Sequence, residues 1–337
     1  MAWYNSNGKS PDTVISSRIR LARNLNGYPF PSILEASASN EIIEKVNAVL
    51  DPKGFRKINF SDLSPLMATS YVERHYVSPA FANKETPHAL MLQEQSGTAV
   101  MICEEDHLRI QCILPGLSLN EAYQKACETE RALDQEMDFS YDATLGYMTQ
   151  CPTNLGTGLR VSVMMFLPAL SETGSMDALA VQLSKIGLTI RGIFGEGSGS
   201  VGCMYQISNQ VSLGVTEQEI LQGMEEAVQQ ISERERKARK SNDGDVLDRL
   251  TDRILRSAGI LRSAYMMSAS EYVRLFADVR LGISMGLIRD ISYEQLGNLL
   301  IEVMPATLTL SSENTPRTEN ARDKLRAQKI QSVLHVK

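Results

Sequence analysis

CPTNLGTGLR, residues 151–160, leads directly into the apolar run VSVMMFL, residues 161–167, and this junction predicts a turn followed by a strand. The apolar run has the length and composition of a buried strand. The ten residues before it contain two glycines and a proline, which favour a turn. Cys151 and Arg160 are thus brought to a strand end, where functional sites are commonly built. A glycine turn with a small buried cysteine is the structural alternative.

The composition is that of an ordinary globular protein. Of its 337 residues, 43% are hydrophobic and 22% are charged, enough for a large core. A net charge of −6 argues against direct nucleic-acid binding, which needs a basic face. The polar N-terminus has no signal-peptide core, and no apolar run is long enough to span a membrane. Five cysteines without a CxxC pair predict reduced thiols and a cytoplasmic location rather than disulfides or a zinc site.

Arginines alternate with apolar residues in TVISSRIRLARNL, residues 13–25. Period-2 spacing predicts that Arg18 and Arg20 lie on one face of a strand. Because neighbouring guanidinium groups repel each other, we expect an anionic group opposite them. A solvated strand face is the alternative.

Acidic residues stand at a second strand end, in EEDHLR, residues 104–109. Adjacent strand residues face opposite ways, so Glu104 and Glu105 are not expected to share a role. The strand that carries Arg109 would anchor this acidic turn to a core. A solvated acidic turn is the alternative.

A glycine-rich loop separates two further strands within residues 188–209. It contains five glycines between positions 192 and 202 and also holds Glu196. Five glycines cost backbone entropy unless the loop must move or approach a ligand closely. The alternative is a disordered hairpin tip.

Helical patterns surround these strands and dominate the second part of the chain. Residues 35–50 and 119–136 are predicted to form amphipathic helices, with Ser39 and Asn120 as candidate N-caps. From Glu217 onward no strand-like alternation occurs. The predicted fold is therefore α+β over residues 1–240, followed by an α-helical domain over residues 241–337.

Four of these segments together resemble a known family. In order and spacing, the phosphagen (guanidino) kinase catalytic domain has signature segments similar to SSRIRLAR (16–23), EEDHLR (104–109), CPTNLGTGLR (151–160) and RGIFGEGSGSVGCMYQISN (191–209). The resemblance implies an antiparallel sheet flanked by helices. It also implies transfer of the γ-phosphoryl group of ATP to a guanidinium nitrogen.

A motif in the helical domain points to one branch of this family. ARDKLRA, residues 321–327, is similar to the RDxxRA pattern of bacterial protein arginine kinases of the McsB type, and only 15 residues precede Ser16, where phosphagen kinases carry a lid domain. The resemblance implies that residues 241–337 mediate dimerisation and bind phosphoarginine through Arg322, Asp323, Arg326 and Ala327. The alternative is an Asp323–Arg326 ion pair on a solvated helix face.

Nucleotide binding is implied for residues of several segments. With no GxxxxGK[ST] loop in the sequence, arginines must neutralise the phosphates, and Mg²⁺ should be held by phosphates and water rather than by protein ligands. His75 stands beside apolar residues, where a histidine is often only structural. Creatine kinases have a histidine at the position of Met164. The resemblance implies ATP binding by Ser16, Ser17, Arg18, Ile19, Arg20, His75, Arg109, Arg160, Val161, Ser162, Val163, Met164, Arg191, Gly192, Ile193, Phe194, Gly195 and Glu196.

The catalytic residues that the resemblance implies are Glu105, Cys151 and Glu196. A guanidinium has a pKa above about 12, so its nitrogen needs help to attack. Carboxylates can bind it bidentately and accept its proton, and Glu105 is the predicted general base. Glu196 favours arginine over creatine as the acceptor, and a Cys151 thiolate would add a further negative charge.

Three functions fit these residues. The first is an ATP-dependent protein arginine kinase, under allosteric control, that marks proteins for Clp-protease degradation in stress and quality control. The others are a free-arginine kinase and a non-catalytic phosphoarginine-binding regulator. The implied partners are proteins with exposed arginines, a second copy of the chain, a zinc-finger activator of the McsA type, a CtsR-type repressor and the Clp ATPase and protease.

Overall fold

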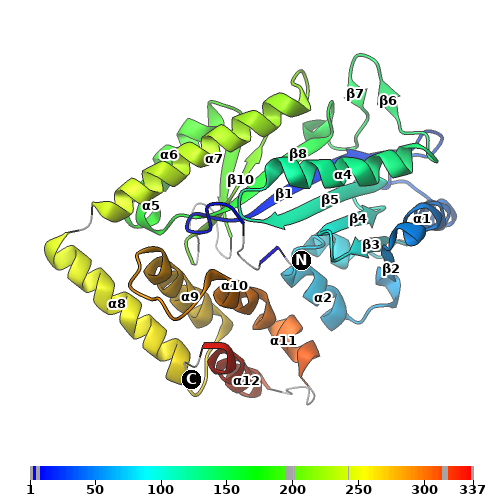
Figure 1. Cartoon of the computed structure of the whole chain (residues 1–337). Coiled ribbons are helices and arrows are strands. Elements are labelled where there is room, and N and C mark those ends of the chain that lie inside the picture. Colours follow the sequence, from blue (N-terminus) through cyan, green and yellow to red (C-terminus); the bar gives the residue numbers. More distant parts are fainter. Residues whose placement is uncertain are drawn as a thin grey trace.

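An eight-stranded antiparallel sheet forms the centre of the molecule in the computed structural model, which describes residues 3–4, 8–193, 200, 202–241, 243–312 and 318–334. Its strand order is β2-β3-β4-β5-β1-β8-β10-β9 (Figure 1). A separate hairpin pairs β6 (Tyr141–Asp142) with β7 (Gly146–Tyr147). The strands of the large sheet are β1 (Val14–Arg23), β2 (Arg56–Asn59), β3 (Ala89–Gln93), β4 (Thr98–Ile102), β5 (Leu108–Pro115), β8 (Leu159–Phe166), β9 (Leu188–Gly192) and β10 (Met204–Asn209).

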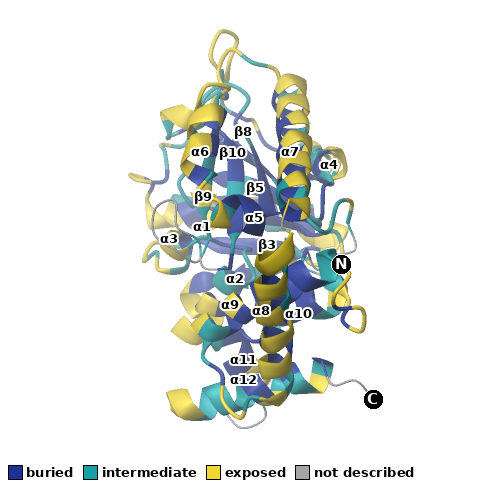
Figure 2. Cartoon of the chain, turned by 90° about the vertical axis from the view of Figure 1, so that its left-hand side faces the viewer, coloured by how far each residue is buried: buried dark blue, intermediate teal, exposed yellow. Residues whose placement is uncertain are grey.

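Helices cover one face of this sheet. The alternation within β1 turns Ile19 and Leu21 toward them, where both side chains are completely buried. Figure 2 shows the resulting dark, buried strands behind helices whose outer faces are exposed. The helices on this face are α1 (Ala36–Leu50), α4 (Leu119–Asp134), α5 (Pro168–Glu172), α6 (Met176–Ser184) and α7 (Glu217–Lys240). Helices α2 (Pro65–Glu73) and α3 (Pro79–Ala82) pack through a separate core on the other face of β3 and β4.

The C-terminal region is helical and packs against the sheet through a second core. That core joins Ile15, Ile113 and Phe166 of the sheet to Tyr272 and Phe276 of α9. In Figure 1 these helices lie together below the sheet. They are α8 (Gly244–Ser263), α9 (Ala269–Ser284), α10 (Tyr293–Glu302), α11 (Pro305–Ser311) and α12 (Glu319–Leu334).

This architecture confirms the predicted α+β fold with an antiparallel sheet and a C-terminal helical region. The boundary at residues 240–241 falls between α7 and α8 and stays a prediction. Across the described residues, we find no helix with the length and apolar character that crossing a membrane requires.

The predicted helix caps were wrong. Residue Ser39 lies inside α1, where its hydroxyl donates to the carbonyl of Glu35, the residue before the helix. Helix α4 begins at Leu119, so Asn120 is already helical. Both helices begin before the residue predicted as the N-cap. Hydroxyl and amide side chains also occur within the first turn of a helix, so their presence alone does not mark its start.

Candidate active site

Four strands, β1, β5, β8 and β9, bring arginines to the sheet face opposite the helix-side core. On β1, Arg20 lies opposite Arg160 of β8, and Ala22 lies opposite Arg109 of β5. On β10, Gln206 lies opposite Arg191 of β9. Neighbours of these residues along each strand pack into the helix-side core, so the arginines must face the other way. The alternation predicted for Arg18 and Arg20 is therefore found, and both residues line the same cleft.

The charge of this cluster is poorly compensated. Burial, together with repulsion from Arg160 and Arg109, lowers the pKa of Arg18 to about 10. Burial and neighbouring guanidinium groups also lower the pKa values of Arg20 and Arg160. Within the described part of the chain, the buried Nε atoms of Arg20 and Arg160 have no hydrogen-bond partner. A polyanion would relieve the repulsion and supply acceptors, so the residues present fit a nucleotide triphosphate.

Glu104 and Glu105 both bind the guanidinium of Arg109, which corrects the expectation that their side chains face opposite ways. The Glu104 carboxylate lies 2.8 Å from Arg109 Nη1, and that of Glu105 lies 3.0 Å from Nη2. The two acids belong to a bend rather than a strand. This bend begins at Cys103, whose backbone is left-handed (φ +59°). Strand alternation therefore does not separate their side chains.

Cys151 lies beside these groups at the rim of the cleft. It precedes a 3₁₀ turn, Pro152–Asn154, and its Sγ lies 3.0 Å from Thr153 Oγ1. Its side chain is partly exposed, so the alternative of a buried structural cysteine is wrong. Cys151, Glu105 and the five arginines line one cleft of about 320 Å³.

Gly158 is required because the chain passes closely over β1 as it enters β8. Its backbone is left-handed (φ +61°), and an added Cβ would lie 2.4 Å from Arg23 Nη1 and 2.6 Å from the carbonyl oxygen of Ala22. The turn thereby carries Cys151 to the cleft on one side and Arg160 on the other.

Buried polar residues that the sequence analysis did not select hold these segments together. One Asp106 oxygen accepts hydrogen bonds from Asn24 Nδ2 (2.7 Å) and from the backbone N–H of Gln150 (2.8 Å). Arg23 is fully buried, donates to Glu130 (2.6 Å), and lies 3.4 Å from the ring centroid of Tyr147. The recognised motifs contain Arg23 and Asp106, and Asn24 directly follows the first of them. Their place in or next to these motifs was the only feature of the sequence that could have identified them.

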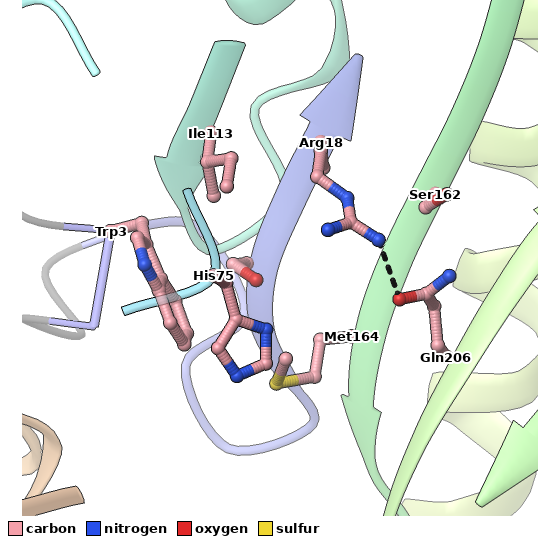
Figure 3. Close-up of a pocket in the computed structure, with 8 residues that line it drawn as sticks. Trp3, Arg18, His75, Ile113, Ser162, Met164 and Gln206 are labelled. Carbon is pink, nitrogen blue, oxygen red and sulfur yellow. Dashed lines mark hydrogen bonds between the residues drawn. The ribbon is translucent and has the colours of Figure 1, made fainter. Parts of the chain in front are cut away.

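His75 lies outside the cleft that Cys151 lines, in a neighbouring cavity. It lines a cavity of about 430 Å³ that Arg18 and Arg20 also line, and Ile193 contributes to the same wall. Figure 3 shows its imidazole between Trp3 and Met164, with Arg18 bonded to Gln206 (2.8 Å). Ser16 and Ser162 line the adjoining pocket.

Several predicted nucleotide residues do not point into the cleft. Ile19, Val161 and Val163 are buried in the helix-side core. Ser17 donates to the carbonyl oxygen of Gly116 and accepts from the N–H of Ser118, so its hydroxyl serves the sheet. The positions Phe194, Gly195 and Glu196 lie outside the described residues.

The RDxxRA segment lies on α12, and its second arginine faces inward. Arg326 is 1% exposed, donates to the carbonyl oxygens of Val303 (2.9 Å) and Met267 (2.7 Å), and pairs with Asp323. The alternative of a solvated ion pair is therefore wrong, because the pair is largely buried. Ala327 is buried as well, which leaves Arg322 and Asp323 as the partly exposed members.

The residues described here contain no group of three or more His, Cys, Asp or Glu side chains placed to hold a metal ion. The carboxylates of Glu104 and Glu105 both bind Arg109. Binding of Mg²⁺ through the phosphates of a nucleotide stays an expectation.

Comparison with known proteins places the chain in a family. The ATP:guanido phosphotransferase C-terminal catalytic domain matches residues 38–238, and the protein-arginine kinase McsB C-terminal domain matches residues 247–337. The protein-arginine kinase of Halothermothrix orenii is 40% identical over 99% of this chain and 96% of its own length. The chain belongs to the protein-arginine kinase family. A second relative, from Brevibacillus brevis, is 38% identical over 99% of this chain and 95% of its own.

Solved structures share the fold of this protein-arginine kinase family member. The substrate-free duplicated taurocyamine kinase from Schistosoma mansoni matches 77% of this chain and 39% of its own chain, with a TM-score of 0.61 and 24% identity. A lombricine kinase matches 71% of each chain, with a TM-score of 0.61 and 22% identity. At these identities the likeness concerns the guanidino-kinase fold alone.

Proposed function

We propose that this chain is an ATP-dependent protein arginine kinase, which transfers the γ-phosphoryl group to arginine side chains of proteins. The observation that carries the proposal is the cluster of five arginines on one sheet face, beside Glu105 and Cys151 in one cleft. The name that the curated relatives share, protein-arginine kinase, supports a protein rather than a metabolite as acceptor.

The donor side of the reaction relies on charge neutralisation. Arg18, Arg20, Arg109, Arg160 and Arg191 would bind the phosphate oxygens, and their positions are fixed by the strands, so little reorganisation is needed. Mg²⁺, held by the phosphates, would further neutralise the charge that develops in the transition state.

The acceptor side requires a base and an anionic environment. A guanidinium nitrogen attacks the γ-phosphorus, the new N–P bond forms, and the bond to the bridging oxygen breaks to release ADP. The nitrogen loses its proton to the carboxylate of Glu105, whose side chain is 39% exposed toward solvent. Cys151 and Glu196 would hold the guanidinium in place.

The wider role is also part of the proposal and rests on the family resemblance. Residues 1–240 would form the catalytic domain, and residues 241–337 would mediate dimerisation and bind phosphoarginine. The phosphorylated proteins would be degraded by the Clp protease in cytoplasmic quality control. A zinc-finger activator of the McsA type and a CtsR-type repressor would be partners.

One assay tests the reaction. The full chain is given Mg-ATP with labelled γ-phosphate and either free arginine or an unfolded protein, and acid-labile label on arginine is measured. We expect label on the protein and not on free arginine. Label on free arginine alone would favour a phosphagen kinase, and label on neither would favour a non-catalytic phosphoarginine-binding protein.

A further inference from the structure

Trp3 is the single tryptophan of the chain, and it lines the small pocket beside His75 and Arg18 that adjoins the cleft. Its side chain is 2% exposed, and its ring centroid lies 4.9 Å from that of His75 (Figure 3). The indole Nε1–H donates to the carbonyl oxygen of Arg74 at 2.8 Å. Trp3 precedes residues 38–238, the region that matches the guanidino-kinase catalytic domain.

The backbone at His75 needs such support. Its φ of +63° is left-handed, a conformation that is unfavourable for a residue with a Cβ. The N–H groups of His75 and Tyr76 end helix α2 by donating to Val72 and Tyr71. Two side chains then hold the turn from outside. Trp3 binds the carbonyl oxygen before His75, and Gln111 Nε2 donates to that of Tyr76 at 2.7 Å.

The cavity that His75 lines combines two kinds of side chain. It is lined by the guanidinium groups of Arg18 and Arg20 and by the apolar side chains of Val72, Val77 and Met101. A ligand with a polyanionic end and an aromatic end matches this combination. Burial and the nearby Arg18 lower the pKa of His75 to about 3, so its ring is neutral and offers a flat, weakly polar surface.

We propose that Trp3 is a positioning residue for the nucleotide, which fixes the His75 imidazole as the wall against which the purine base packs. The inference rests on the proposed kinase function and extends it to a segment outside the matched catalytic region. Trp3 itself is held by the second core, in which it packs with Ile113 and Met164. Displacement of the indole would release the turn and lose the base wall, while the strand-borne arginines would stay in place.

Binding to two ligands separates this role from general stabilisation. Calorimetry with the full chain compares Mg-ATP with tripolyphosphate, which carries the phosphates but no base. For Trp3→Ala we expect roughly tenfold weaker ATP binding and tripolyphosphate binding within about twofold of the unmodified protein. Trp3→Phe keeps an aromatic ring without the N–H donor, and we expect an intermediate loss. Likewise, the KM for ATP should rise more than kcat falls.

Equal weakening for both ligands, or unchanged ATP binding in Trp3→Ala, would overturn the inference. Fluorescence tests it without any substitution, because all tryptophan emission comes from Trp3. Mg-ATP should change that emission, whereas tripolyphosphate should not. If saturating Mg-ATP leaves the emission unchanged, the role of Trp3 is overturned, whereas the kinase proposal is not. If the unmodified protein does not bind ATP at all, the kinase proposal fails together with this inference.

Discussion

Glu104 and Glu105 bind one guanidinium but differ in their surroundings. The Glu104 side chain is 10% exposed and also accepts from the hydroxyl of Ser78 and the N–H of Glu105. The Glu105 side chain is 39% exposed and reaches the cleft. Buried, multiply bonded carboxylates stabilise a turn, whereas an exposed ion pair contributes little to folding. Glu105 can therefore exchange its partner for a substrate.

The first prediction concerns this pair. Glu105→Gln should lower kcat for phosphoryl transfer by roughly 10²- to 10⁴-fold, because the amide cannot accept the guanidinium proton. Its thermal midpoint should stay close to that of the unmodified protein. Glu104→Gln is the matched control and should lower the midpoint through the loss of its buried contacts. Initial rates and thermal unfolding of both variants decide, and a fully active Glu105→Gln protein would exclude the assigned base.

His75 predicts a dependence of stability on pH. In the unfolded chain it binds a proton below its ordinary pKa of 6.5, but in the folded protein only below about 3. This group therefore makes stability fall as the pH decreases from 6.5 toward 3. Between pH 7 and pH 4.5 the unmodified protein should lose roughly 2–3 kcal/mol more than His75→Asn, since asparagine tolerates the left-handed backbone and does not titrate. Urea denaturation at both pH values measures the difference, and equal losses would contradict the prediction.

Charged groups that face the ligand could be assigned from the sequence, whereas groups that hold the site could not. Arg18 and Arg20 reveal a common face by their spacing. Arg23 and Asp106 occur in the same motifs, yet their roles depend on contacts with Glu130 and Gln150, which are distant in sequence. Long-range pairing of this kind has no local pattern.

At the scale of elements, the entry into β8 depends on Gly158. Gly158→Ala adds a Cβ next to a backbone carbonyl that cannot move without shifting β1. Gly174→Ala is a matched control, because its φ is +67° but nothing lies within 4 Å of the added atom. Both substitutions introduce the same left-handed backbone strain. Gly158→Ala should therefore lower the free energy of unfolding by at least about 2 kcal/mol more than Gly174→Ala does. Denaturant midpoints measure this, and similar losses for both variants would indicate that the close approach is unimportant.

On helix α12, the two arginines of the RDxxRA motif differ in burial: Arg326 is buried and Arg322 is partly exposed. Arg326→Ala removes a buried ion pair and two carbonyl contacts, so it should cost roughly 3–5 kcal/mol of stability. Arg322 is partly exposed, and its Nε lacks a partner among the described residues. Arg322→Ala should therefore fold normally but bind phosphoarginine more weakly by calorimetry. If its binding is unchanged, the motif is purely structural.

The long helices were predictable and α11 was not. Helices α7 and α8 have clear apolar periodicity and flanking breaks, so their presence followed from the sequence. Helix α11 spans only Pro305–Ser311 and carries two threonines, which have low helix propensity. Its N-terminus is instead stabilised from outside by Glu73 of α2.

At the scale of the whole molecule, one sheet contributes to three hydrophobic cores. The helix-side core fixes β1, β5 and β8 from one face, and the second core joins the far ends of these strands to the C-terminal helices. A third core packs α2 and α3 on β3 and β4, and the arginine cluster lies on the same face of the sheet. The sequence indicated both regions but not their docking, because the second core and the Glu73 contacts join residues that are far apart in the sequence.

Glu73 therefore carries the last prediction. Its carboxylate accepts from the N–H groups of Ala306 (2.8 Å) and Thr307 (2.7 Å) and from the Thr307 hydroxyl (2.7 Å). Glu73→Ala leaves these buried donors unpaired, so it should cost roughly 1–3 kcal/mol and speed amide exchange across residues 305–311. Thr307→Ala removes only the hydroxyl bond and should leave that exchange nearly unchanged. Equal exchange in Glu73→Ala and the unmodified protein, measured by mass spectrometry, would mean that α11 docks without this contact.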